Sequence, residues 1–162
     1  MLNLKEVKSE KLKPVRLSTE AKSLFGIALL FFVFSCKKET TSTAPSIEFV
    51  SITPSSVKVG EETVNITISY KDADGDLGEN NSDVKNMFVT DNRNGVVYQF
   101  RIQQLAPSGS SISIQGNLSV AMPNTGISDG VSSESATFSV YVKDRAGNES
   151  NSVSTSAITV LK

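Results

Sequence analysis

Residues 70–83 read YKDADGDLGENNSD, and three aspartates in this stretch are separated by single small residues. Asp72, Asp74 and Asp76 are followed by further oxygen-bearing side chains at Asn80 and Asp83. Calcium prefers about six to eight hard oxygen ligands, and this stretch is rich in them. Three carboxylates within five residues also repel one another, and a divalent cation would relieve that repulsion. The spacing therefore predicts a candidate metal loop.

Counted from Asp72, the side-chain ligands fall at positions one, three, five, nine and twelve, and the carbonyl of Gly78 falls at position seven. This spacing resembles the calcium loops of EF-hand-like and thrombospondin-type repeats. It departs from them at position six, where Leu77 stands in place of a glycine, and no helical pattern flanks the loop. The resemblance implies calcium held by a loop between strands.

The alternative is a solvated acidic turn. In such a turn the aspartate side chains accept hydrogen bonds from nearby backbone N–H groups, and water screens their charge. The residues alone leave both interpretations open.

Enzyme chemistry has little support in the composition. The chain of 162 residues contains no histidine and no tryptophan, and Cys36 is its only cysteine. A nucleophile–histidine pair is therefore excluded, and so is an intramolecular disulfide. Paired carboxylates for glycoside hydrolysis would need a large cleft with aromatic walls. Only seven aromatic residues follow Cys36, and most are expected to point inward. We predict a protein without catalytic activity.

The N-terminal part predicts export. Residues 1–23 are rich in lysine, and an apolar run extends from Leu24 to Phe34. This run is about half the length of a membrane-spanning helix, as expected for a secretion signal covering residues 1–35. The sequence VFSC, residues 33–36, resembles the lipobox of bacterial lipoproteins. The resemblance implies a covalent lipid on Cys36, which becomes the mature N-terminus.

Residues 36–46 are polar and predict a flexible tether that keeps the following domain close to a membrane. Lys37, Lys38 and Glu39 partly resemble a surface-export signal of some bacterial lipoproteins, which leaves the periplasmic and cell-surface faces open. The location implied is the cell envelope, with the outer membrane favoured. Without residues 1–35 the chain carries 10 basic and 14 acidic residues. This mildly acidic balance excludes nucleic acid as an expected partner.

From residue 47 onward the apolar residues alternate with polar ones, which indicates half-buried antiparallel strands. In residues 63–70 the alternation predicts that Val64, Ile66, Ile68 and Tyr70 point inward. Inward positions are also predicted for Val96, Tyr98, Phe100, Ile102, Ile112, Ile114, Leu118, Val120, Phe138, Val140 and Val142. Gly116 interrupts one strand and suggests a bulge. Seven short strands over residues 47–162 predict an all-β, two-sheet antiparallel sandwich.

The segment VYVKDRAGNES, residues 140–150, resembles the end of bacterial immunoglobulin-like domains, where a strand is followed by an Asp-x-Ala-Gly-Asn turn. The resemblance implies an immunoglobulin-like sandwich in which this turn and the acidic loop share one end. Asp144, Asn148 and Glu149 would then lie near the acidic loop, and Asp144 is a weaker candidate ligand. We favour a structural role for Asp144, because an aspartate that starts such a turn commonly bonds the turn's backbone.

The leading hypothesis is a lipid-anchored binding or scaffolding module with an unidentified protein or glycan partner. The alternative is a carbohydrate-binding accessory lipoprotein of a glycan-uptake system, which would hold sugar with calcium and exposed aromatic rings. Tyr141 is the one aromatic residue expected on an outward face. Two or more coplanar exposed rings would favour this alternative.

Overall fold

A computed structural model describes residues 42–123, 126–128 and 130–162. The predicted signal peptide, Cys36 and residues 37–41 of the tether lie outside the described residues. Every described strand belongs to one compact unit, which ends at Lys162. The described part contains no helix that is long and apolar enough to cross a membrane.

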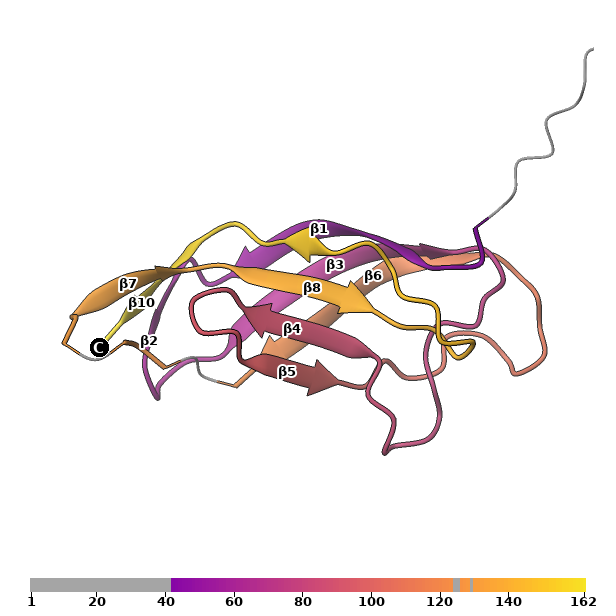
Figure 1. Ribbon diagram of the computed structural model, residues 1–162, viewed down its shortest axis with the longest axis horizontal. Coiled ribbons are helices and arrows are strands. Elements are labelled where there is room, and N and C mark those ends of the chain that lie inside the picture. The colour runs from indigo at the N-terminus through magenta and orange to yellow at the C-terminus, as the bar shows by residue number, and fades with distance from the viewer. Residues whose placement is uncertain (1–41, 124–125, 129) are drawn as a thin grey trace, which may run out of the picture. The chain divides into compact units, whose positions relative to one another are not determined.

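The described residues form an all-β sandwich (Figure 1). Its strands are β1 (Ser46–Thr53), β2 (Ser56–Lys58), β3 (Val64–Asp72), β4 (Met87–Asp91), β5 (Val97–Phe100), β6 (Ile114–Met122), β7 (Ser133–Ala136), β8 (Phe138–Val142), β9 (Val153–Ser154) and β10 (Ile158–Leu161).

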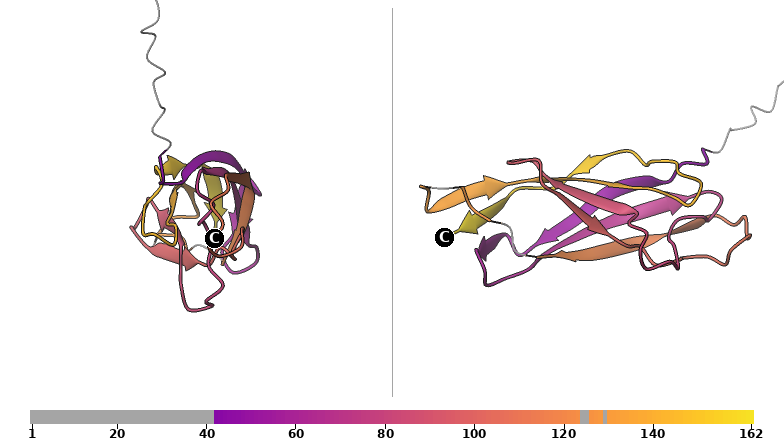
Figure 2. Two further views of the ribbon diagram at one scale, coloured as in Figure 1. Left: turned by 90° about the vertical axis from the view of Figure 1, so that its right-hand side faces the viewer. Right: turned by 60° about the horizontal axis from the view of Figure 1, so that its bottom comes forward.

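Two antiparallel sheets form the main layers, seen from further sides in Figure 2. One sheet has the order β1-β3-β6, and the other has the order β5-β4-β8-β9. A third sheet has the order β2-β10-β7, and within it β2 runs parallel to β10. The two main sheets agree with the all-β antiparallel sandwich expected from the sequence, whereas the third sheet and its parallel pair were not expected.

All seven predicted strands are present, and three further short strands appear. Two of the extra strands, β7 and β9, are short because the chain is interrupted before β8 and before β10. Thr155 marks the interruption: its hydroxyl accepts the N–H of Phe138 at 3.0 Å, and its own N–H donates to the carbonyl of Phe138 at 2.9 Å. The buried Thr155 side chain thus replaces one bond of the regular ladder where the second and third sheets meet.

The core lies between the sheets and follows the predicted alternation in β3 and β8. Four other residues predicted to point inward are partly buried and pack against the core: Tyr98, Phe100, Ile114 and Leu118. The inward residues of β3 and β8 are buried, and Phe138 is the largest fully buried side chain. These side chains belong to one continuous cluster, whose members are Ile47, Ile52, Val57, Val64, Ile66, Ile68, Tyr70, Leu77, Met87, Val89, Ile102, Val120, Met122, Ala136, Phe138, Val140, Val142, Ile158 and Val160. Burial of apolar surface is therefore the main stabilising term.

The alternation fails where a strand ends. Val96 is 47% exposed and Ile112 is 51% exposed, although both were predicted to point inward. Strand β5 begins only at Val97 and β6 only at Ile114, so these two side chains belong to loops whose orientation no ladder fixes. The bulge predicted at Gly116 is also wrong: Gly116 pairs in register with Tyr70, and the register shifts in β1 between Phe49 and Ser51.

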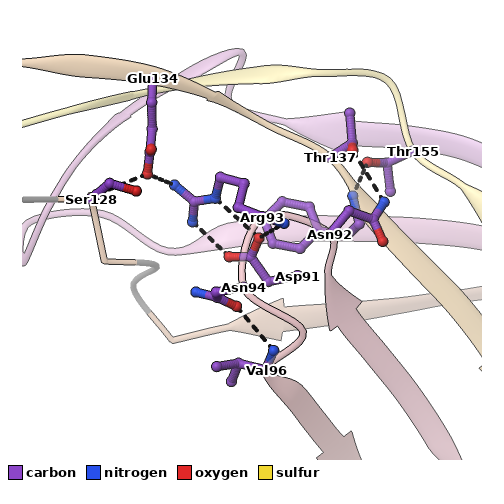
Figure 3. Close-up of polar contacts among 10 residues, drawn as sticks. Asp91, Asn92, Arg93, Asn94, Val96, Ser128, Glu134, Thr137 and Thr155 are labelled. Carbon is purple, nitrogen blue, oxygen red and sulfur yellow. Dashed lines mark hydrogen bonds and ion pairs between the residues drawn. The ribbon is translucent and has the colours of Figure 1, made fainter. Parts of the chain in front are cut away.

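The hairpin between β4 and β5 is held by a polar network (Figure 3). Arg93 forms an ion pair with the fully buried Asp91, with Nη2 and Oδ2 2.6 Å apart, and a second ion pair with Glu134 on β7. Hydrogen bonds from Ser128 and the charge of Arg93 hold the pKa of Glu134 below its usual value. Asn92 adds a hydrogen bond to Thr137 at 3.1 Å. These polar side chains fix the hairpin.

The loop after β3, the connection from β5 to β6 and the turn after β8 gather at one end of the sandwich, on the right in Figure 1. The N–H of Glu79 donates to the carbonyl of Ile102 at 2.9 Å, and the N–H of Arg145 donates to the carbonyl of Asp76 at 3.2 Å. Strand β1 begins at the same end, because Ser46 pairs with Lys71. The acidic loop is therefore enclosed by two other segments.

Candidate metal centre

Three carboxylates converge at this end of the sandwich. Asp72, Asp74 and Asp76 each place one oxygen within 4.8 Å of the oxygens of the other two. Two oxygens bound to the same calcium ion at about 2.4 Å lie at most about 4.8 Å apart. The three oxygens therefore fit the surface of one ion, and they are the one such group of acidic side chains in the part of the chain that the structure describes.

One oxygen of each of these three carboxylates is buried and has no hydrogen-bond partner. This is true of the Oδ1 atoms of Asp72, Asp74 and Asp76, and Asp72 as a whole is only 1% exposed. A buried carboxylate oxygen without a donor has lost its hydration and gained nothing in return, which is strongly unfavourable. A solvated acidic turn would leave these oxygens to water or to backbone N–H groups. The geometry instead indicates a site that a cation would complete.

Each outer aspartate uses its second oxygen to fix its position. Asp72 Oδ2 accepts the N–H of Leu77 at 2.8 Å, and the Leu77 side chain is fully buried in the core. Asp76 Oδ2 accepts the N–H of Ala146 at 3.1 Å, in the turn after β8. The remaining oxygen of each carboxylate is buried and has no hydrogen-bond partner. Asp72 is therefore held by the backbone of the loop itself, and Asp76 is held by the turn after β8.

Arg145 closes the loop from the side of the turn. Its Nη1 donates to the carbonyl of Gly78 at 2.8 Å, and its Nη2 lies 3.4 Å from the carbonyl of Gly75. These carbonyls flank Asp76 and Leu77 in the sequence. The side chain of Arg145 therefore joins the two ends of the segment that carries the third carboxylate.

The two glycines of the loop lie against the β5–β6 connection. Gly75 and Gly78 have φ of +74° and +89°, a conformation that side chains rarely adopt. A Cβ atom at Gly75 would overlap the carbonyl of Ile112, and one at Gly78 would overlap the carbonyl of Gln103. The chain therefore needs glycine at both positions for its path and for its packing.

The remaining predicted ligands lie elsewhere. Asn80 is exposed, and its side-chain nitrogen donates to Gln104 Oε1. Asp83 is also exposed, and its Oδ1 lies 3.4 Å from the hydroxyl of Ser82. Asp83 does not belong to the carboxylate group, and the amide nitrogen of Asn80 is engaged by Gln104. The convergence of carboxylates therefore covers positions one, three and five of the predicted loop.

Asp144 takes the structural role favoured from the sequence. Its Oδ1 accepts the N–H of Asn148 at 2.7 Å, and its Oδ2 accepts the Asn148 side-chain amide at 2.9 Å. Both carboxylate oxygens are thus engaged by the turn. Asp144 is nevertheless close enough for its charge to raise the pKa of Asp76. Glu149 pairs with Lys143 at 3.7 Å between Oε1 and Nζ.

The electrostatics of the cluster favour a bound cation. Burial raises the pKa of Asp74, and the contacts with Asp72 and Asp76 raise it further. Burial also raises the pKa of Asp76, with the charge of Asp144 as the next cause, while the N–H of Ala146 opposes the rise. Either a proton or a metal ion would relieve the repulsion, and near neutral pH a metal ion is the more effective of the two.

The outward face of the second sheet carries an aromatic pair. Phe88 and Tyr141 are cross-strand neighbours on β4 and β8, and their rings stack with centroids 4.7 Å apart and planes 11° apart. Both residues are half-buried. Each ring turns one face toward the other ring, so the pair does not form a coplanar platform.

Sequence reasoning missed the residues that hold the cluster in place. Leu77 was noted only as a departure from the glycine of calcium loops, and Arg145 was not considered. The signal available for Arg145 was its positive charge, because it belongs to a turn that was expected to lie near the acidic loop.

This arrangement of carboxylate oxygens can hold a cation. No protein-family model matches the chain, and the comparison with curated proteins finds no match. The cluster itself therefore carries the functional argument.

Proposed function

We propose that the protein is a non-catalytic, lipid-anchored protein of the bacterial cell envelope, whose immunoglobulin-like sandwich is a binding or scaffolding module stabilised by calcium. The observation that carries this proposal is the set of three buried Oδ1 atoms without hydrogen-bond partners, on Asp72, Asp74 and Asp76. A loop of this kind is costly to fold empty and becomes favourable when an ion supplies the missing interaction.

The donor set favours calcium among the common metals. All three groups are carboxylates, and the chain has no histidine, so softer transition metals find none of their preferred nitrogen ligands. Magnesium needs a near-ideal octahedron and usually keeps several of its waters. Calcium accepts irregular oxygen cages, and backbone carbonyls or water can complete its shell.

The lipid anchor and the ion would act on the same end of the domain. Only ten residues lead from Cys36 to Ser46, a reach of at most about 35 Å. Ser46 pairs with Lys71, the residue before Asp72. An ion at the cluster would therefore strengthen the part of the domain through which the tether enters.

The glycan-binding alternative receives no support from the aromatic residues. Phe88 and Tyr141 stack on each other, whereas a sugar platform needs ring faces that are open side by side. The lack of histidine in the sequence and the acylation expected at Cys36 also favour a module that binds and does not catalyse.

The test is thermal unfolding of the full chain, purified in detergent, in calcium and in chelator. A ligand that binds only the folded state stabilises it by about 2.7 kcal/mol at a hundredfold excess over Kd. For a domain of this size we expect the melting temperature to rise by about 10 °C. Magnesium at the same concentration should raise it much less. Equal melting temperatures in calcium and chelator, without heat of binding in calorimetry, would refute the calcium site.

A further inference from the structure

We propose that Arg145 is a positioning residue of the carboxylate cluster, which holds the loop in its ion-receiving shape before the ion binds. This inference rests on the proposed calcium site and assigns a role to a residue outside the ligand set. A positive side chain beside a cation site would ordinarily weaken binding, so the role needs a structural argument.

Arg145 bonds to three carbonyls of the acidic loop. Its guanidinium reaches the carbonyls of both Gly75 and Gly78, and its backbone N–H donates to the carbonyl of Asp76 at 3.2 Å. These three acceptors belong to one loop segment of four residues. No other residue reported in the described structure makes hydrogen bonds to so many carbonyls of this segment. Arg145 therefore fixes the curvature of the loop.

The metal-free loop has a reason to open. Asp72, Asp74 and Asp76 repel one another, and separating them would hydrate their buried oxygens. Two bonds from one rigid guanidinium oppose that opening, because the planar fork holds both carbonyls in a fixed relation. The cost of arranging the ligands is then met during folding, and less of it remains to be met when calcium binds.

Two effects of removing Arg145 therefore have opposite signs. Loss of a positive charge near the site would tighten calcium binding through electrostatics alone. Loss of the clamp would weaken binding, because the ion would have to organise the loop itself. Since each charged hydrogen bond is worth a factor of about ten or more, we expect the clamp to dominate.

The test is calcium titration by calorimetry on the full chain in detergent. We expect Arg145→Met to raise Kd by about tenfold. Arg145→Lys should also raise Kd, because an ammonium group keeps the charge and cannot hold both carbonyls in the same way. Arg101→Met is the matched control: Arg101 Nη1 lies 3.3 Å from the carbonyls of Glu79 and Asn80, beyond the segment that Arg145 clamps. We expect its Kd to stay within about twofold of the wild type.

The outcomes separate the two proposals. An unchanged or lower Kd in Arg145→Met would overturn the positioning role while leaving the calcium site in place. An equal rise in Arg101→Met would also overturn it, because the effect would then be one of general charge or loop stability. Circular dichroism checks folding, and Arg145→Lys carries the test if Arg145→Met does not fold. A wild-type protein that binds no calcium would refute the site and the role together.

Discussion

Asp72 and Leu77 hold each other across the turn that opens the acidic loop. The N–H of Leu77 donates to Asp72 Oδ2 at 2.8 Å, and the Leu77 side chain is fully buried in the core. One oxygen of Asp72 is therefore bonded to the loop backbone, and the other is buried without a hydrogen-bond partner. The residue that departs from known calcium loops is thus the anchor that connects the cluster to the core. Ion binding at the cluster should therefore change the free energy of unfolding of the whole domain.

The double substitution Asp74→Asn and Asp76→Asn tests the cluster directly. We expect it to abolish the rise in melting temperature with calcium. In chelator it should leave the domain as stable as the wild type or slightly more stable, because two repelling charges are removed and an amide can donate to a neighbouring carboxylate. Thermal unfolding of both proteins with and without calcium measures the two effects.

Asp83→Asn is the control for that experiment. It removes one negative charge, where the double variant removes two, from an exposed position in the same loop. The calcium response should persist. Its disappearance would mean that Asp83 is a ligand, as the spacing of EF-hand-like loops suggests.

Stability without metal should depend on pH through Asp74 and Asp76. The pKa of each is raised in the folded state by burial, followed for Asp74 by contact with Asp72 and for Asp76 by the charge of Asp144. A raised folded-state pKa adds stability below the unfolded value, about 4, and this contribution is lost as the pH rises through the folded value. In metal-free buffer we expect the wild type to gain stability on acidification relative to the double variant. Denaturant unfolding of both at several pH values measures the difference, and parallel pH profiles would contradict it.

Truncation on the two faces of β3 should have unequal costs. Ile66 is fully buried, whereas the neighbouring Thr67 points outward and shares a hydrogen bond of 2.8 Å with Ser119. Ile66→Ala should reduce the free energy of unfolding by about 2–5 kcal/mol. Thr67→Ala should cost less than about 1 kcal/mol. Similar losses in chemical denaturation would show that the two faces are not packed as described.

Two glycines with similar backbone conformations separate strain from packing. Gly78 and Gly109 have φ of +89° and +78°, but a Cβ atom at Gly78 would overlap the Gln103 carbonyl, whereas nothing lies within 4 Å at Gly109. Gly109→Ala should therefore cost about 1 kcal/mol of backbone strain. Gly78→Ala should lower the free energy of unfolding by clearly more than Gly109→Ala does. It should also weaken calcium binding. Equal losses of unfolding free energy would mean that the loop relaxes away from residue 103.

Cys36→Ala tests the anchor. We expect the variant to remain unprocessed or to leave the membrane fraction, because it lacks the thiol that accepts the lipid. Labelling with radioactive palmitate should mark the wild type and not the variant. Absence of label in the wild type would refute the lipoprotein interpretation, and protease treatment of intact cells would separate the surface from the periplasmic face.

The sequence predicted the strands well where alternation coincides with a ladder. All four inward positions of β3 are buried, because β3 is a central strand paired with β6 over its whole length and with β1 from Asn65 to Lys71. Val96 and Ile112 were placed wrongly because alternation carries no information once the ladder ends. The interruption at Thr155 was not predictable either, since it depends on a hydroxyl that meets the N–H of Phe138 from a distant part of the chain.

The cluster was predictable in part. Alternating aspartates give three carboxylates close together in space whatever the loop does next, so Asp72, Asp74 and Asp76 could be named from the sequence. Asn80 and Asp83 could not be placed, because the chain turns away where the N–H of Glu79 bonds to the carbonyl of Ile102. The contribution of Arg145 comes from a turn about seventy residues away, and only the folded topology brings the two together.

The parallel pairing of β2 and β10 should make the domain resistant to a pulling force. Val57 and Val160 are partners in this pair, and hydrogen bonds of 2.9 Å from Val59 to Leu161 and from Thr159 to Ser55 extend it. A pull between the segment before β2 and the C-terminal end of β10 would slide these parallel strands along their length. Their bonds would then be loaded together, whereas peeling breaks them one after another. With the lipid proposed at Cys36 holding one end and a pull applied through the C-terminal strand, the domain should therefore resist force, and Val57→Pro should lower its unfolding force in single-molecule pulling experiments.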